Sequence, residues 1–344
     1  MKRDYCFFIL VFLIFASGCS RGEEFKIVYS NGKVKNPPQE SNESKSITIA
    51  IVPKLVNIPY FNAVEEGAAE AGKDLGVKVI YKGPTVADAD QQIRIINKLI
   101  DQKVDVIAIS ANDPDKLVPV LQKAERQHIK VMTWDSDTQT NSREFFINMV
   151  NPETLGRHLM DTLAWKLNEE GEFAIITGAK SAANLNKWLN WIQVQQKENY
   201  PKMHLIKIVA SDDDPHKAYI LAKQLLSQYP NLKGIIGNSS VGPPAAAQAV
   251  KEAGQAGKVV VVGLSPPNPM NQYLKENDAQ IVTLWSPKKL GYLTVALAAN
   301  LIKGQRPFDG EKIPQVGKIN MIDDMVIMGE PIDFTKDNVD QYDF

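Results

Sequence analysis

Cysteine is almost absent from this chain of 344 residues, which contains only two. Cys6 lies in an apolar leader that we expect to be removed, and Cys19 follows that leader directly. Residues 20–344 therefore contain no thiol, which excludes an internal disulfide, a cysteine-based metal site and a redox pair. Stability has to come from burial of apolar groups, and roughly 325 residues are enough for two domains with separate cores.

Catalytic signatures are also missing. The histidines are few, and they do not lie at the carboxyl end of any predicted strand: His128, His158, His204 and His216. The sequence contains no G-x-S-x-G elbow, no P-loop and no H-E-x-x-H motif. We therefore expect a protein that is not an enzyme and that needs no cofactor and no metal.

Charge of neither sign is in excess. Lysine and arginine total 39 against 40 aspartates and glutamates, which gives a formal net charge of −1. This balance, without a basic arm or an acidic tail, provides no footprint for nucleic acid. After the leader, no apolar run is long enough to cross a bilayer. The sequence therefore predicts neither nucleic-acid binding nor a membrane span.

The N-terminus has the pattern of an export signal. A positive start is followed by the apolar run Cys6–Phe15 and by small residues at 16–18. The run is well short of the roughly 20 residues that a membrane span requires. A cysteine directly after the small residues resembles a bacterial lipoprotein box. This resemblance implies a signal peptide over residues 1–18 and a lipid on Cys19. We expect residues 19–46, which are polar, to be a flexible tether to the membrane, in the periplasm or on the outer face of the cytoplasmic membrane.

From Ile47 onward, apolar runs of strand length alternate with helical patterns. Strands are expected at 47–53, 77–81, 104–110, 129–134, 172–178, 204–210, 234–238, 258–264 and 279–285. Helices are expected at 62–75, 87–101, 113–127, 152–168, 184–198, 215–228, 244–253, 268–276 and 287–303. Alternating strands and helices indicate parallel sheets that are buried on both faces. The sequence therefore predicts an α/β fold of two doubly wound parallel-sheet units in tandem.

Polar and aromatic side chains follow several predicted strands, at the edge where open parallel sheets bind ligands. In the first unit these are Lys54, Tyr60, Phe61, Trp134 and Asp135. In the second unit they are Asn184, Asn186, Ser239 and Ser286. Aromatic faces stack on the C–H faces of a sugar ring, whereas carboxylates and amides pair with its hydroxyls. The pattern therefore predicts a sugar-binding cleft, with Trp188 and Trp285 as further stacking candidates.

Each candidate also has a structural interpretation. Asp135 is typical of an Asx turn that caps a loop. Lys54 fits a solvated surface position, and Tyr60 and Phe61 fit an ordinary core. The run of three aspartates at 212–214 is typical of a helix N-cap rather than of a metal site.

Six segments carry a resemblance to a known family. They are IAIVPKL (49–55), MTWDSDT (132–138), PAAAQ (244–248), VGLSPPNPM (262–270), LWSPKKLGYL (284–293) and DNVDQYDF (337–344). The chain resembles periplasmic sugar-binding proteins of the ribose-binding class (type I), which supply ABC importers. Within that class it resembles the rhamnose-binding and autoinducer-2-binding branch.

This resemblance implies two lobes with a ligand cleft between them, joined by a three-crossing hinge. The lobes would comprise 47–150 plus about 286–310 for the first, and 151–285 plus about 311–344 for the second. The crossings would lie near Asn151, near Trp285-Ser286 and in the stretch after Gly304. Closure of a monomer over its ligand would be the signal that an ABC permease reads.

The resemblance also implies particular ligand contacts. Lys54 and Asp135 would contact the ligand from the first lobe, and Pro244 and Ala246 would contact it from the start of a second-lobe helix. Together with the pattern of residues, this predicts a lipid-anchored substrate-binding protein of an ABC importer. Its ligand would be a small sugar, either rhamnose-like or another deoxy or pentose sugar.

Autoinducer-2 binders carry an Asp-Gln pair where this chain has Asn184 and Leu185, and an Asp where it has Ser286. A hydrogen bond to a charged group contributes about 1.5–3 kcal/mol, so losing two such partners costs about 3–6 kcal/mol. The differences disfavour autoinducer-2, and Leu185 favours a less hydroxylated patch such as the methyl group of a deoxy sugar. Two alternatives stay open: an autoinducer-2 receptor for uptake, or a ligand-sensing module for a chemoreceptor or sensor kinase.

Overall fold

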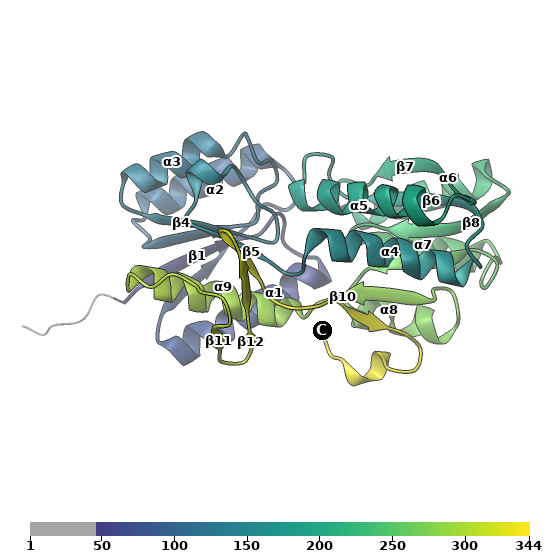
Figure 1. Cartoon of the computed structure of the whole chain (residues 1–344). Coiled ribbons are helices and arrows are strands. Elements are labelled where there is room, and N and C mark those ends of the chain that lie inside the picture. Colours follow the sequence, from purple (N-terminus) through teal and green to yellow (C-terminus); the bar gives the residue numbers. More distant parts are fainter. Residues whose placement is uncertain (1–45) are drawn as a thin grey trace, which may run out of the picture. The chain divides into compact units, whose positions relative to one another are not determined.

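The computed structural model describes residues 46–344 (Figure 1). The expected signal peptide, the expected lipid on Cys19 and nearly all of the expected tether lie outside the described residues. Among the residues that the structure describes, none of the helices combines the length and the apolar character that a membrane crossing requires.

The first half of the fold is built on a sheet with the strand order β13-β14-β5-β4-β3-β1-β2. Neighbouring strands pair in parallel, except that β13 runs antiparallel to β14. The strands are β1 (Thr48–Val52), β2 (Lys78–Tyr81), β3 (Val106–Ile109), β4 (Lys130–Trp134), β5 (Phe146–Asn148), β13 (Asn320–Ile322) and β14 (Met325–Ile327). The helices that cover this sheet are α1 (Pro59–Leu75), α2 (Ala89–Asp101), α3 (Val118–Arg126) and α9 (Pro287–Ile302).

Alternation along β1 divides its side chains between two cores. Ile49 and Ile51 pack in the core that contains residues of α1 and α9. Ala50 and Val52 pack in the core that contains residues of α2 and α3. Figure 1 shows the same division, with α2 and α3 on one face of the sheet and α1 and α9 on the other. A continuous apolar run such as residues 49–52 is therefore needed, because both faces of the strand are buried there.

Helices α1 and α9 approach closely because glycines lie at their crossing. A Cβ atom on Gly67 would collide with the carbonyl oxygen of Lys288. A Cβ atom on Gly291 would collide with the carbonyl oxygen of Val64. The two glycines therefore allow α9 to pack against α1 backbone to backbone.

The second half is built on a sheet with the strand order β15-β10-β9-β8-β6-β7, in which only β15 is antiparallel to its neighbour. The strands are β6 (Gly171–Thr177), β7 (Met203–Ala210), β8 (Leu232–Gly237), β9 (Val260–Leu264), β10 (Ile281–Leu284) and β15 (Ile332–Phe334). The helices of this half are α4 (Pro152–Lys166), α5 (Ala183–Asn199), α6 (Pro215–Gln228), α7 (Gly242–Glu252) and α8 (Pro267–Lys275). Short elements complete the described chain: the β11–β12 hairpin (Lys312–Ile313 and Gly317–Lys318) and the 3-10 turns Thr140–Ser142 and Val339–Gln341.

The chain passes between the two sheets after β5, after β10 and between β14 and β15. The predicted fold class, two doubly wound parallel-sheet lobes, is confirmed. The expectation that residues from about 311 onward belong to the second lobe is wrong for β13 and β14, which extend the first sheet beside β5, whereas β15 does pair with β10 of the second sheet. Arg143 helps to hold β13 and β14 beside β5. Its guanidinium pairs with Asp137 at 2.9 Å and with Asp324, which lies in the turn between β13 and β14.

Candidate functional site

A cavity lies where the carboxyl ends of strands from both sheets meet. Its lining combines charged, amide, hydroxyl and aromatic side chains with aliphatic ones. The lining residues are Lys54, Ile58, Tyr60, Phe61, Asp135, Asn184, Leu185, Trp188, Asp213, Ser239, Ser240, Leu264, Leu284 and Trp285. The cavity thus brings together predicted ligand contacts, namely Lys54, Tyr60, Phe61, Asp135, Asn184 and Ser239, and the predicted stacking candidates Trp188 and Trp285.

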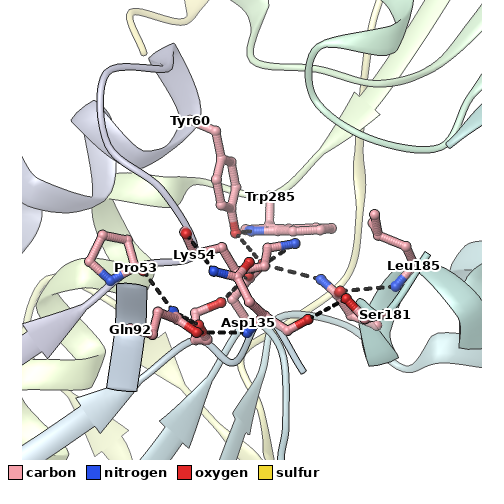
Figure 2. Close-up of polar contacts among 11 residues, drawn as sticks. Pro53, Lys54, Tyr60, Gln92, Asp135, Ser181, Leu185 and Trp285 are labelled. Atoms are coloured by element: carbon pink, nitrogen blue, oxygen red, sulfur yellow. Dashed lines mark hydrogen bonds and ion pairs between the residues drawn. The ribbon is translucent and has the colours of Figure 1, made fainter. Parts of the chain in front are cut away.

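Asp135 is the most densely connected group of the cavity (Figure 2). It follows β4 in a left-handed backbone conformation with a φ of 61°, and its side chain is buried. Its Oδ2 accepts a hydrogen bond from Ser110 Oγ at 2.6 Å and lies 3.8 Å from Lys54 Nζ. Its Oδ1 accepts hydrogen bonds from Tyr60 Oη at 3.1 Å and from Asn184 Nδ2 at 3.4 Å. Asn184 belongs to α5, so this carboxylate joins the two halves of the fold.

Burial has the largest effect on the pKa values of Asp135 and Tyr60. It raises the pKa of Asp135, although Lys54 and the hydrogen bonds from Ser110 and Tyr60 act to lower that pKa. Burial also raises the pKa of Tyr60 well above its usual range, and the charge on Asp135 adds to this. Tyr60 therefore stays protonated at neutral pH and donates its hydrogen to Asp135.

Gln92 holds the strand ends that carry the site, and the sequence did not mark it as functional (Figure 2). Its Nε2 donates to the carbonyl oxygens of Pro53 and Ser110, at 3.0 and 2.8 Å. Its Oε1 accepts from the backbone N–H of Asn112 at 2.9 Å. One side chain thus ties the end of β1 to the end of β3. A polar residue on the buried face of α2, one turn before Ile96, was the signal that could have revealed it.

The second half of the fold contributes polar atoms that lack partners among the described residues. Trp188 Nε1, Asp213 Oδ2 and Ser239 Oγ are buried, and none has a hydrogen-bond partner among the described residues. Buried polar atoms without partners are rare in proteins. These three line the same cavity, so a ligand with several hydroxyl groups would satisfy them.

Aromatic side chains form the apolar wall of the cavity. The rings of Tyr60 and Trp285 meet edge to face, with centroids 6.1 Å apart, and Trp285 Nε1 donates to Tyr60 Oη at 3.2 Å. The ring centroids of Trp188 and Trp285 are 5.8 Å apart, and the two ring planes are inclined by 59°. Together with Leu185, these rings provide a face against which the C–H groups of a sugar can pack.

Five predicted site residues do not line the cavity, each for a local reason. Trp134 is fully buried, and its indole N–H donates to the carbonyl oxygen of Ala108 at 3.2 Å. Ser286 accepts a hydrogen bond from the backbone N–H of Lys289 and so caps α9. The other three lie on helices: Asn186 on the exposed side of α5, and Pro244 and Ala246 within α7.

The three aspartates at 212–214 have different environments and different roles. Asp214 caps α6 by accepting from the backbone N–H of Lys217 at 2.7 Å, as the sequence predicted for this run. Asp212 is exposed and pairs with the Lys217 ammonium. Asp213 is buried and lines the cavity, which the sequence did not reveal because three identical residues carry no sign of their direction.

Residues 49–306 match the family model of the periplasmic binding protein domain. This match covers most of the chain, so the chain belongs to the periplasmic binding protein family. It is 26% identical over 267 residues to the D-ribose/D-allose-binding protein of Pseudomonas aeruginosa, covering 75% of this chain and 83% of that protein. The predicted family resemblance is confirmed, and the relatives named here are binding proteins rather than enzymes.

Solved structures of the same fold hold small ligands. A solute-binding protein from Clostridium phytofermentas with bound L-rhamnose is 31% identical, with a TM-score of 0.82, covering 86% of this chain and 98% of that chain. LsrB from Clostridium saccharobutylicum in complex with AI-2 is 26% identical, with a TM-score of 0.82, covering 87% and 100%. A protein from Burkholderia graminis in complex with D-arabinose is 32% identical, with a TM-score of 0.77, covering 87% and 99%.

Proposed function

We propose that this protein is the lipid-anchored substrate-binding component of an ABC importer and that it captures a small sugar in the cavity. The observation that carries the proposal is the composition of that cavity. A buried Lys54–Asp135 pair, unpartnered polar atoms and a wall of indole rings surround one space. Hydroxyl groups need paired donors and acceptors, and sugar C–H faces need aromatic or aliphatic surface.

Within the sugars, we propose a rhamnose-like deoxy sugar or a pentose. Relatives of the same fold at 31% and 32% identity hold L-rhamnose and D-arabinose. Leu185 contributes an aliphatic surface to the lining, which suits a methyl group better than a hydroxyl group.

A thermal-shift panel on residues 46–344 tests this proposal. The panel contains L-rhamnose, L-fucose, D-ribose, D-xylose, D-arabinose, D-glucose and autoinducer-2. A ligand at about 100 times its dissociation constant adds about 2.7 kcal/mol to the free energy of unfolding and raises the Tm. We expect a shift with one deoxy sugar or pentose, and a panel without any shift would contradict the proposal.

Autoinducer-2 is the second candidate, because LsrB in complex with AI-2 has the same fold with a TM-score of 0.82. Asn184 and Leu185 stand in the cavity where such binders carry a carboxylate and an amide, which weakens this candidate. A shift with autoinducer-2 alone would replace the sugar proposal by this one.

Membrane anchoring is tested separately. We expect Cys19→Ala to release the exported protein from the membrane fraction while it keeps its sugar affinity. Retention of the variant in the membrane fraction would contradict the lipid anchor.

A further inference from the structure

Asp213 is a buried carboxylate that has no evident structural partner. It is 4% exposed, it lines the cavity, and its Oδ2 has no hydrogen-bond partner among residues 46–344. The neighbouring aspartates already cap α6 and pair with Lys217, so neither of those roles is left for Asp213. A carboxylate buried without donors is unfavourable, which indicates that its donors come from elsewhere.

The backbone at Asp213 and at the preceding residue has an uncommon conformation. Asp212 and Asp213 both have left-handed backbones, with φ values of 56° and 57°. Consecutive residues in this sparsely populated region are strained, and such strain is concentrated at binding sites.

Gly178, which directly follows β6, provides the space for the carboxylate. A Cβ atom at this position would collide with Asp213 Oδ1, so any other residue at 178 would displace the side chain. The local sequence and backbone thus make room for one inward carboxylate.

We propose that Asp213 is a specificity-determining residue of the second half, which accepts hydrogen bonds from hydroxyl groups of the bound sugar. The inference rests on the proposed function and names the contact that compensates for the missing carboxylates at Asn184 and Ser286. Asp135 already has donors from Ser110, Tyr60 and Asn184, whereas Asp213 Oδ2 has none. Asp213 therefore discriminates between sugars that differ only in these hydroxyl groups, because a sugar without them leaves its carboxylate unpaired.

Calorimetric titration of Asp213→Asn with L-rhamnose and its monodeoxy derivatives tests the assignment. Asparagine tolerates the left-handed backbone and nearly matches aspartate in shape, so only the charge and one acceptor are lost. We expect the affinity for L-rhamnose to fall about 10- to 100-fold. In wild type, one monodeoxy derivative should bind much more weakly than L-rhamnose, and in Asp213→Asn this difference should largely disappear.

Asp212→Asn is the matched control. It makes the same change in the adjacent residue, which is exposed and has the same backbone conformation, and its sugar affinity should equal that of wild type. Without sugar, we expect the Tm of Asp213→Asn to equal or exceed the wild-type Tm, because a buried charge without donors has been removed.

Unchanged affinity in Asp213→Asn, or an equal loss for L-rhamnose and every monodeoxy derivative, would overturn the inference and leave the proposed function intact. An amino sugar that binds more tightly than L-rhamnose, and loses this advantage in Asp213→Asn, would overturn it in favour of a cationic ligand. If wild type binds no sugar, the proposed function fails first. A lower Tm of Asp213→Asn would then assign Asp213 a structural role.

Discussion

At the scale of single residues, the lining of the cavity consists of groups that have hydrogen-bond partners within the chain and groups that have none among the described residues. Asp135 and Tyr60 belong to the first kind, since they are hydrogen-bonded to each other and to their neighbours. Trp188, Asp213 and Ser239 belong to the second kind. The first half of the fold thus presents an ordered polar surface, and the second half presents free bonding capacity.

Gln92→Leu should lower both the stability and the sugar affinity of the protein, although Gln92 does not line the cavity. The substitution leaves the carbonyl oxygens of Pro53 and Ser110 and the N–H of Asn112 without their partner. Since one unsatisfied buried group costs about 1–3 kcal/mol, we expect a loss of about 2–4 kcal/mol in the free energy of unfolding. Sugar affinity should also fall, because Lys54 and Ser110 lose their fixed positions. Urea denaturation and calorimetry measure the two effects.

Gln102→Leu is the control, because Gln102 is an exposed residue at the end of the same helix. It should change neither quantity by more than the error of measurement. Equal stability of Gln92→Leu and Gln102→Leu would refute the positioning role of Gln92.

The rule that ligands bind at the carboxyl ends of strands identified from the sequence many of the residues that line the cavity. It failed for Trp134, because this residue is still within β4 and alternation turns its ring into the core beside Phe61. It failed for Asn186, which lies two residues after Asn184 and therefore points away from the cavity on α5. Asp213 was missed because it stands in a run of three identical residues, and the sequence does not show which of them is buried.

At the scale of elements, long periodic segments were predicted well and short ones were missed. α6 has the bounds that its sequence pattern predicts, because Asp214 and Pro215 mark its start. α3 begins at Val118 rather than at 113, since Asp113 Oδ1 accepts hydrogen bonds from the N–H groups of Asp115 and Lys116 and forms a turn there. β5, β13 and β14 have three residues each, which is too short for a periodic signal.

Gly291→Ala should separate α9 from α1. Its Cβ atom would meet the backbone of Val64, which cannot move as a flexible side chain can. Overpacking of this kind costs about 1–3 kcal/mol, and we expect a loss of that size in urea denaturation. Gly329→Ala serves as the comparison, because a Cβ atom there meets nothing within 4 Å. Equal stability of the two variants would show that the crossing tolerates a methyl group.

At the scale of the whole described chain, His158 on α4 and Asp333 on β15 connect distant segments through a contact of 2.8 Å. The hydrogen bond and the charge of Asp333 raise the pKa of His158, although burial acts to lower it. Burial acts to raise the pKa of Asp333, but the hydrogen bonds from His158 and Thr283 keep it below its usual value. The ordinary pKa values of aspartate and histidine are about 3.8 and 6.5. The contribution of the pair to stability is therefore fully present between these two pH values.

Stability should consequently decline as the pH rises from 6.5 through the raised pKa of His158, since the folded state then loses a proton that the unfolded state has already lost. We expect His158→Gln to flatten the free energy of unfolding between about pH 6 and 8. His216→Gln, on the exposed face of α6, should retain the wild-type slope. Parallel pH profiles for wild type and His158→Gln would contradict this assignment.

The late addition of β13 and β14 to the first sheet also has a consequence for biosynthesis. β5 ends at Asn148, but its partner β14 begins only at Met325, near the end of the chain. At about 5–20 residues per second, a ribosome needs on the order of ten to thirty seconds to make the intervening segment. During that interval the edge of β5 has no neighbour on this side, so the nascent chain cannot complete its first sheet. We therefore expect the first sheet to lack its last two strands, and the fold to stay incomplete, until synthesis of the chain is almost finished.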